Sequence, residues 1–244
     1  MNCPKCGADQ ASDTICEHCG IVFEKYYKYH PRPGEAPLPV VHRHRRGRGA
    51  PGLTTLLLPV DQKGDWPALI VRATLLVILA LWGMRLALSS VASNAAGESF
   101  LHLVNLPFHE FGHILFRPFG AFLASLGGTL GQLLMPLICF GVLLISTRDP
   151  FGASVALWWF GENFLDIAPY INDARAGQLP LLGGNYGYSS PYGFHDWEYI
   201  LAESGLLHLD HALARTSYLL GTLIMLTALV WGATLLYRHY QQLR

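Results

Sequence analysis

Two histidines and a glutamate form the motif best suited to chemistry, His109-Glu110-Phe111-Gly112-His113. Histidines four residues apart project from one face of a helix, about one turn from each other, and can bind the same metal ion. Glu110 lies about 100° around the helix axis, where it can act on water at the metal without being a ligand. The motif therefore predicts a catalytic zinc site with Glu110 as the general base. The alternative is a buried histidine pair satisfied by hydrogen bonds to neighbouring helices.

Four cysteines near the N-terminus predict a second metal site of a different kind. They occur in two Cys-x-x-Cys-Gly knuckles, as Cys3, Cys6, Cys16 and Cys19. Each knuckle presents two thiolates to one ion, and four thiolates complete the tetrahedron of a structural zinc site. Residues 1–27 resemble a zinc ribbon, which is expected to recruit or sense a protein partner. Two disulfides are the alternative, disfavoured because the basic flank predicts a reducing, cytoplasmic side.

The elements that must position the histidine motif are membrane helices. The chain is 51% hydrophobic and 14% charged, whereas soluble domains carry about 25% charged residues. Residues 67–240 are predicted to form an all-α, multi-span membrane domain with about five transmembrane helices. The apolar runs cover residues 69–88, 100–116, 119–146, 151–171 and 216–237, the third interrupted at Gly127-Gly128-Thr129.

The segment between the ribbon and the membrane domain, residues 28–66, is predicted to be a Pro-rich cytoplasmic linker. Its basic cluster consists of Arg43, Arg45, Arg46 and Arg48. Basic residues favour the cytoplasmic side and anionic lipid, so we expect a multi-pass protein of the cell inner membrane with its N-terminus in the cytoplasm. A nucleic-acid partner is not expected.

The topology of the C-terminal part stays open. Five crossings would place Arg238 and Arg244 outside the cytoplasm, against the positive-inside rule. Either one run is re-entrant or broken, or residues 197–213 dip into the membrane.

Polar residues fall on one face of two of the predicted helices. In the second run they lie within about 80° of arc and are His102, Asn105, His109 and His113. In the fourth run they are Glu162, Asp166 and Asp173, with Asn163 beside them, provided that the helix continues past Pro169. Polar faces of apolar helices should point into the protein interior. A catalytic zinc site takes three protein ligands, so a third ligand is expected from outside the histidine helix.

Together these residues resemble the site-2 protease class of intramembrane zinc metalloproteases. In that family a later span carries an Asn, then a Pro-containing segment and an Asp ligand, which here correspond to Asn163, Pro169 and Asp173. The resemblance implies His109, His113 and Asp173 as zinc ligands, and Asn163 as a residue that hydrogen-bonds the substrate backbone or the oxyanion.

The second motif departs from the family pattern. The family Asp is usually followed by Gly and lies closer to the Asn, whereas Ala174 follows Asp173 here. The third ligand therefore stays open between Asp173 and its rivals Asp166, His195 and Asp196.

The resemblance implies an endopeptidase that hydrolyses peptide bonds of membrane protein or peptide substrates. Zinc would activate water, and Glu110 would pass the water proton to the leaving amine. The Gly-rich residues 182–188 either gate the substrate or pair with it as a strand, or form a plain surface connection. The alternative function is a non-proteolytic membrane protein that binds, transports or senses metal, with Glu110 as a ligand or relay. A catalytically silent scaffold is a third possibility.

Overall fold

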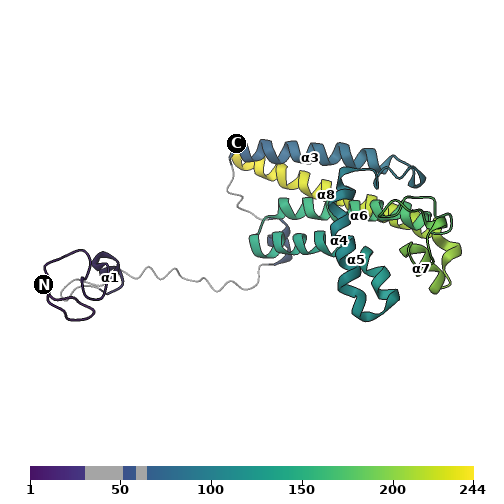
Figure 1. The fold of residues 1–244 in the computed structure, drawn as a ribbon. Helices are drawn as coiled ribbons and strands as arrows, with labels where there is room; N and C mark the ends of the chain where they lie inside the picture. The colour runs from purple at the N-terminus through teal and green to yellow at the C-terminus, as the bar shows by residue number, and fades with distance from the viewer. Residues whose placement is uncertain (31–51, 59–64) are drawn as a thin grey trace. The chain divides into compact units, whose positions relative to one another are not determined.

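The computed structural model describes residues 1–30, 52–58 and 65–244 of the 244-residue chain. The chain divides into two compact units, Met1–Ala50 and Pro51–Arg244, and each is described by itself (Figure 1). Within the described residues the regular secondary structure is helical, apart from a few isolated β-bridges. The all-α prediction is therefore confirmed for these residues. The basic cluster of Arg43, Arg45, Arg46 and Arg48 lies outside the described residues.

The first unit is built from the two cysteine knuckles and one short helix. Isolated bridges join Asn2 to Asp9 and Ile15 to Val22, and α1 follows as Phe23–Tyr29. The buried apolar core holds three side chains, Cys3, Cys16 and Phe23, with Ile21 and Tyr27 packed against it. A core this small stabilises little by burial alone, so a structural metal is expected to supply folding free energy.

The second unit is a helical bundle, and five of its helices match the five predicted apolar runs. The helices are α2 (Leu53–Leu57), α3 (Trp66–Ala87), α4 (Phe100–Phe116), α5 (Ala121–Gly141), α6 (Pro150–Asn172), α7 (Asp196–Glu203) and α8 (Asp210–Leu243). A π-helical segment, Val142–Thr147, continues α5. Short 3₁₀ turns at Val91–Ser93, Arg117–Phe119, Gly187–Ser189 and Leu207–Leu209 connect these helices.

Three of the helical segments in the described residues are long and apolar enough to cross a membrane. They are Trp66–Ala87, Ala121–Thr147 and Leu207–Leu243. This finding indicates a membrane protein.

The sequence suggested an interruption at Gly127-Gly128-Thr129, but α5 runs through it without a break. The glycines are instead the surface on which α4 packs. A Cβ at Gly127 would lie 2.6 Å from the carbonyl oxygen of Gly112, and a Cβ at Gly112 would collide with the carbonyl of Gly127. The glycines therefore allow the two backbones to touch, as small residues do between membrane helices.

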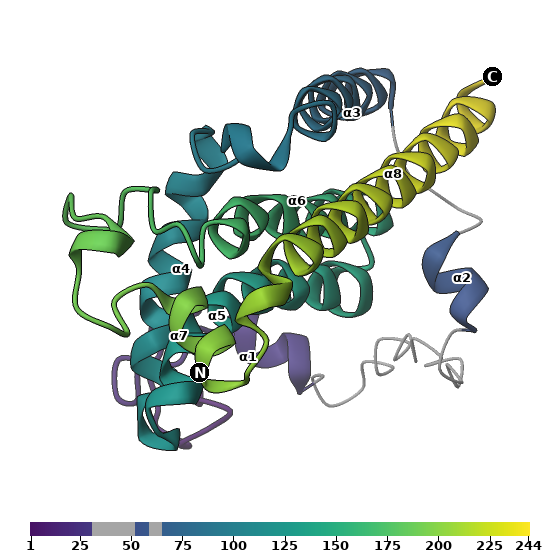
Figure 2. The ribbon, with the colours of Figure 1, turned by 90° about the vertical axis from the view of Figure 1, so that its right-hand side faces the viewer.

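Helix α6 is the most buried element of the bundle. It packs against α8, α5 and α3, and α8 approaches it closely where Gly161 meets Gly221. In Figures 1 and 2, α8 runs along α6, and α4 passes steeply across α6. The helix continues past Pro169 to Asn172, which is the condition under which its three acidic residues share a face. The acidic face of α6 therefore lies inside the bundle, where Glu162, Asp166 and Asp173 are all buried.

Candidate metal centre

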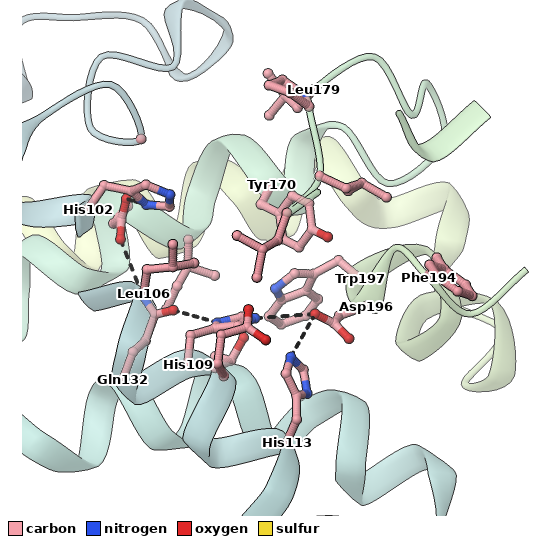
Figure 3. Close-up of a pocket in the computed structure, with 18 of the residues that line it drawn as sticks. His102, Leu106, His109, His113, Gln132, Tyr170, Leu179, Phe194, Asp196 and Trp197 are labelled. Carbon is pink, nitrogen blue, oxygen red and sulfur yellow. Dashed lines mark hydrogen bonds and ion pairs between the residues drawn. The ribbon is translucent and has the colours of Figure 1, made fainter. Parts of the chain in front are cut away.

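The two histidines of α4 meet a carboxylate from α7. The Nε2 atoms of His109 and His113 each lie 3.3 Å from the Oδ2 atom of Asp196, and Figure 3 shows both rings turned toward this oxygen. Ligand bonds of about 2.0–2.1 Å in a tetrahedral zinc site place neighbouring ligand atoms about 3.3–3.4 Å apart. The distances of this group therefore fit a zinc ion bound between the three side chains.

The hydrogen bonds of the two Nδ1 atoms determine which nitrogen of each histidine ring carries the proton. His113 Nδ1 lies 2.8 Å from the carbonyl oxygen of Ala124, which only accepts, so Nδ1 carries the proton. His109 Nδ1 donates in the same way to Gln132 Oε1 at 2.8 Å. Both Nε2 atoms then present lone pairs toward a carboxylate oxygen. This arrangement is repulsive by itself and becomes favourable when a cation lies between the groups.

A chain of hydrogen bonds behind His109 fixes the orientation of Gln132. Asn163 Nδ2 donates to the Trp159 carbonyl at 3.0 Å, and Asn163 Oδ1 accepts from Gln132 Nε2 at 3.1 Å. The Oε1 atom of Gln132 is thus left to accept from His109. Asn163 is fully buried, and in this structure its amide bonds to Gln132 and Trp159 rather than facing the cavity.

Gly128 of α5 provides the space in which the two rings meet. A Cβ at this position would lie 2.5 Å from His109 Nε2 and 2.6 Å from His113 Nε2. Any side chain here would displace both rings, so the glycine is required by the metal centre.

Asp196 is positioned by the residue before it. His195 caps α7, its Nδ1 accepting from the backbone N–H of Glu198 at 3.2 Å, and its ring stacks on Tyr170 with centroids 4.1 Å apart. A carboxylate binds a metal ion in its ionised form, which is the form in which Asp196 would be a ligand.

The other candidates for the third ligand have different partners. Asp173 ends α6 and accepts from the backbone N–H groups of Gln178 and Leu179 at 2.9 and 2.8 Å. Its Oδ2 atom lies 3.6 Å from His195 Nε2. Asp166 pairs with His102 at 2.9 Å. Among the described residues, Asp196 is the candidate that the structure brings together with His109 and His113.

A cavity of about 370 Å³ opens beside this group. Glu110, His109, His113 and Asp196 line it together with apolar residues such as Leu106 and Trp197 (Figure 3). The carboxylate of Glu110 makes no hydrogen bond or ion pair with other residues that the structure describes. It is therefore free to take a proton from water in the cavity.

The four cysteines of the first unit form the second group that could hold a metal. All four Sγ atoms lie within 4.8 Å of one another, with Cys3–Cys19 at 3.7 Å and Cys6–Cys16 at 3.8 Å. The edge of a tetrahedral site with Zn–S bonds of about 2.3 Å is about 3.8 Å, whereas a disulfide bond is about 2.05 Å long. The geometry fits one four-thiolate site and not the alternative of two disulfides.

Backbone geometry of the knuckles supports thiolate binding. Gly7 and Gly20 have φ angles of 75° and 72°, which L-residues with side chains rarely adopt. Burial raises the pKa of the Cys3 thiol, but the N–H groups of Cys6 and Lys5 outweigh it and bring the pKa to about 6. These N–H groups thus favour the ionised form of Cys3, one of the four candidate ligands.

Sequence reasoning did not find the groups that orient the ligand histidines. The Ala124 carbonyl carries no sequence signal, and neither Gly128 nor Gln132 was predicted to contact the histidines. The spacing of four residues between Gly128 and Gln132 on α5 places both on the face that meets α4.

Comparisons with protein-family models, with curated proteins and with solved structures find no match to this chain.

Proposed function

We propose that this protein is an intramembrane zinc-dependent endopeptidase that hydrolyses peptide bonds of membrane-associated substrates. The observation that carries the proposal is the approach of His109 and His113 Nε2 to Asp196 Oδ2 at 3.3 Å, in a cavity that also holds Glu110. Three ligands with a cavity beside them are typical of a catalytic zinc site. The proposal keeps the resemblance to the site-2 protease class and assigns the third ligand to Asp196.

The proposal includes a multi-pass arrangement in the cell inner membrane. Helices α3, α5 and α8 meet the length and hydropathy of membrane spans. We propose that α4 and α6 also lie within the membrane, because α4 packs on α5 and α6 on α8. The basic linker favours a cytoplasmic N-terminus. The ribbon would then hold a structural zinc ion in the cytoplasm and contact a protein partner.

The residues of the cavity divide the chemistry between them. A zinc ion bound by His109, His113 and Asp196 would supply a Lewis acid that polarises a carbonyl group and makes water more acidic. Glu110 takes a proton from the water that attacks the scissile carbonyl carbon, and delivers it to the nitrogen as the C–N bond breaks. Gln132 and the Ala124 carbonyl hold the two imidazoles in the tautomer that binds metal.

The Glu110→Gln variant tests the proposal. The wild type and the variant are purified as full chains and compared in bound zinc and in cleavage of a membrane-spanning reporter. Because Glu110 is not a ligand in the proposal, the variant should keep its zinc and lose cleavage by at least about 100-fold, the usual size of a general-base contribution. Glu98→Gln is the matched control, since Glu98 is exposed and lies outside the cavity lining; it should keep both properties.

Two results would contradict the proposal. Cleavage by Glu110→Gln at the wild-type rate would remove Glu110 as the base. A wild type that binds zinc but never cleaves, with zinc lost from Glu110→Gln, would instead favour a membrane protein that transports or senses metal.

A further inference from the structure

The cavity extends along α4 well beyond the metal ligands. Its lining from this helix includes His102 and Leu106 as well as His109, Glu110 and His113, and Figure 3 shows His102 on the side of His109 away from His113. His102 lies seven residues before His109, which is two turns and about 10.5 Å along the helix. His102 is therefore too far away to bind the same metal ion, yet it faces the same cavity.

His102 is held at the cavity by a buried carboxylate. Its Nδ1 lies 2.9 Å from Asp166 Oδ1, with 38% of the His102 side chain exposed and 2% of the Asp166 side chain. The other oxygen of Asp166 accepts from Asn105 at 3.0 Å and from Gln132 at 3.4 Å. Because Asp166 is fixed from three sides, the His102 ring has a defined orientation.

The surroundings of Asp166 determine the protonation of His102. A buried carboxylate is unfavourable without an opposite charge, and no Lys or Arg is among the described residues that line the cavity. His102 is the basic group in contact with Asp166, so it carries the compensating charge as an imidazolium. Its Nε2 then carries a proton as well, and makes no hydrogen bond within the described part of the chain. The cavity thus contains a fixed donor that lacks an acceptor.

We infer that His102, oriented by Asp166, is a substrate-binding residue that donates a hydrogen bond to an acceptor oxygen of the substrate. An extended peptide advances about 3.3–3.6 Å per residue, so the distance from the metal centre corresponds to about three residues. The acceptor that we assign to it is a side-chain amide or carboxylate oxygen on the residue three positions from the scissile bond. This inference rests on the proposed function, because it places a peptide along α4 with its scissile bond at the metal centre.

Peptide hydroxamates provide a test that does not depend on cleavage. The hydroxamate binds the zinc ion and fixes the peptide at the metal centre. Two pairs of compounds extend from it in the two chain directions, and the members of each pair differ only by Asn or Leu at the third residue. Their dissociation constants are measured on the zinc-loaded full chain in detergent.

The wild type should prefer Asn over Leu by about tenfold in one of the two pairs, the size of one hydrogen bond to a charged group. In His102→Leu this preference should fall to within about twofold. His211→Leu is the matched control, because the His211 side chain is 56% exposed and lies outside the cavity lining; it should keep the tenfold preference.

The outcomes separate the inference from the proposed function. Hydroxamates that bind the wild type without any preference for Asn would overturn the inference and leave the metal centre in place. Zinc-loaded wild type that binds no hydroxamate would overturn the proposed function together with the inference. If His102→Leu fails to fold because Asp166 loses its partner, the double variant His102→Leu/Asp166→Asn removes the unpaired charge and repeats the test.

Discussion

At the scale of single residues, the metal centre depends on which nitrogen of each histidine is protonated. His113 donates to a backbone carbonyl and His109 to a side-chain amide, so both rings are held as neutral metal ligands. The donor set of two imidazoles and one carboxylate suits zinc. The four thiolates of the first unit suit the same ion in a closed site without an open position. One chain therefore presents two candidate zinc sites of opposite design.

The identity of the third ligand can be decided by counting zinc. Asp196→Ala removes a ligand, so we expect about one zinc ion per chain instead of two, measured by elemental analysis of the purified full-length protein. Asp173→Ala should keep two, because Asp173 binds the backbone of Gln178 and Leu179. The reverse pattern, with zinc lost from Asp173→Ala alone, would return the ligand to Asp173.

Gln132 is expected to control zinc affinity without touching the ion. Gln132→Leu removes the acceptor of His109 Nδ1 and should weaken zinc binding by roughly 10–100-fold, as loss of such partners does elsewhere. Competition with a chelator of known affinity measures this change. Gln132→Glu keeps an acceptor and should recover part of the affinity. Equal zinc affinities in the wild type and Gln132→Leu would show that the Gln132 amide has no such role. Gln178→Leu is the control, because Gln178 is exposed, and it should keep the wild-type zinc affinity.

At the scale of secondary structure, the close crossing of α4 and α5 creates the metal centre. Gly112, inside the histidine motif, touches the backbone of α5 at Gly127, and Gly131 touches the Phe108 carbonyl. Because these contacts leave no room for side chains, they fix the separation of α4 and α5 and therefore the distance of the two histidine rings from Gly128. The glycine within His109-Glu110-Phe111-Gly112-His113 thus has a packing role in addition to the chemistry of its neighbours.

Gly128→Ala should therefore abolish the metal centre without changing a ligand. The new methyl carbon would lie 2.5 Å from His109 Nε2 and 2.6 Å from His113 Nε2, so both rings must move, and we expect about one zinc ion per chain and no reporter cleavage. Gly141→Ala in the same helix is the matched control, because a Cβ there meets no atom within 4 Å. A Gly128→Ala protein that holds two zinc ions would mean that the rings lie elsewhere.

The helices were predictable from the sequence because long apolar runs have few other stable conformations. All five runs are helical, and α4 begins and ends where the run of residues 100–116 does. The effect of Gly127 and Gly128 was not predictable, since glycine can break a helix or allow a close approach. Only the partner helix distinguishes these outcomes.

The residues of the site that share one helix were predictable from the sequence, whereas the ligand from another helix was not. His109, Glu110 and His113 lie on one helix, so their spacing alone brings them together. Asp196 comes from α7, which α5 and α6 separate from the histidine helix along the chain. The sequence around Asp196 does not distinguish it from Asp173 as a ligand. The difference is tertiary, because the loop backbone at residues 178 and 179 binds Asp173, while the capping bond of His195 directs Asp196 to the histidines.

At the scale of the whole molecule, the two groups that could hold a metal ion belong to two separate compact units. The first unit has a core of only Cys3, Cys16 and Phe23, so its folding should depend on metal. The second unit has its own apolar core around Trp158, Leu165 and Met225, which does not involve either metal site. Loss of one zinc ion should therefore leave the other unit folded.

Cys16→Ser tests this independence. The variant removes a buried thiolate, so the first unit should lose its zinc and become sensitive to protease within residues 1–30, as seen by mass spectrometry of a limited digest. The second unit should keep one zinc ion and its reporter cleavage, because the residues proposed to bind or orient that ion all belong to the second unit. Cys139→Ser is the control, since Cys139 lies outside both candidate metal groups, and it should retain two zinc ions. Loss of both zinc ions from Cys16→Ser would instead show that the membrane unit requires an intact ribbon.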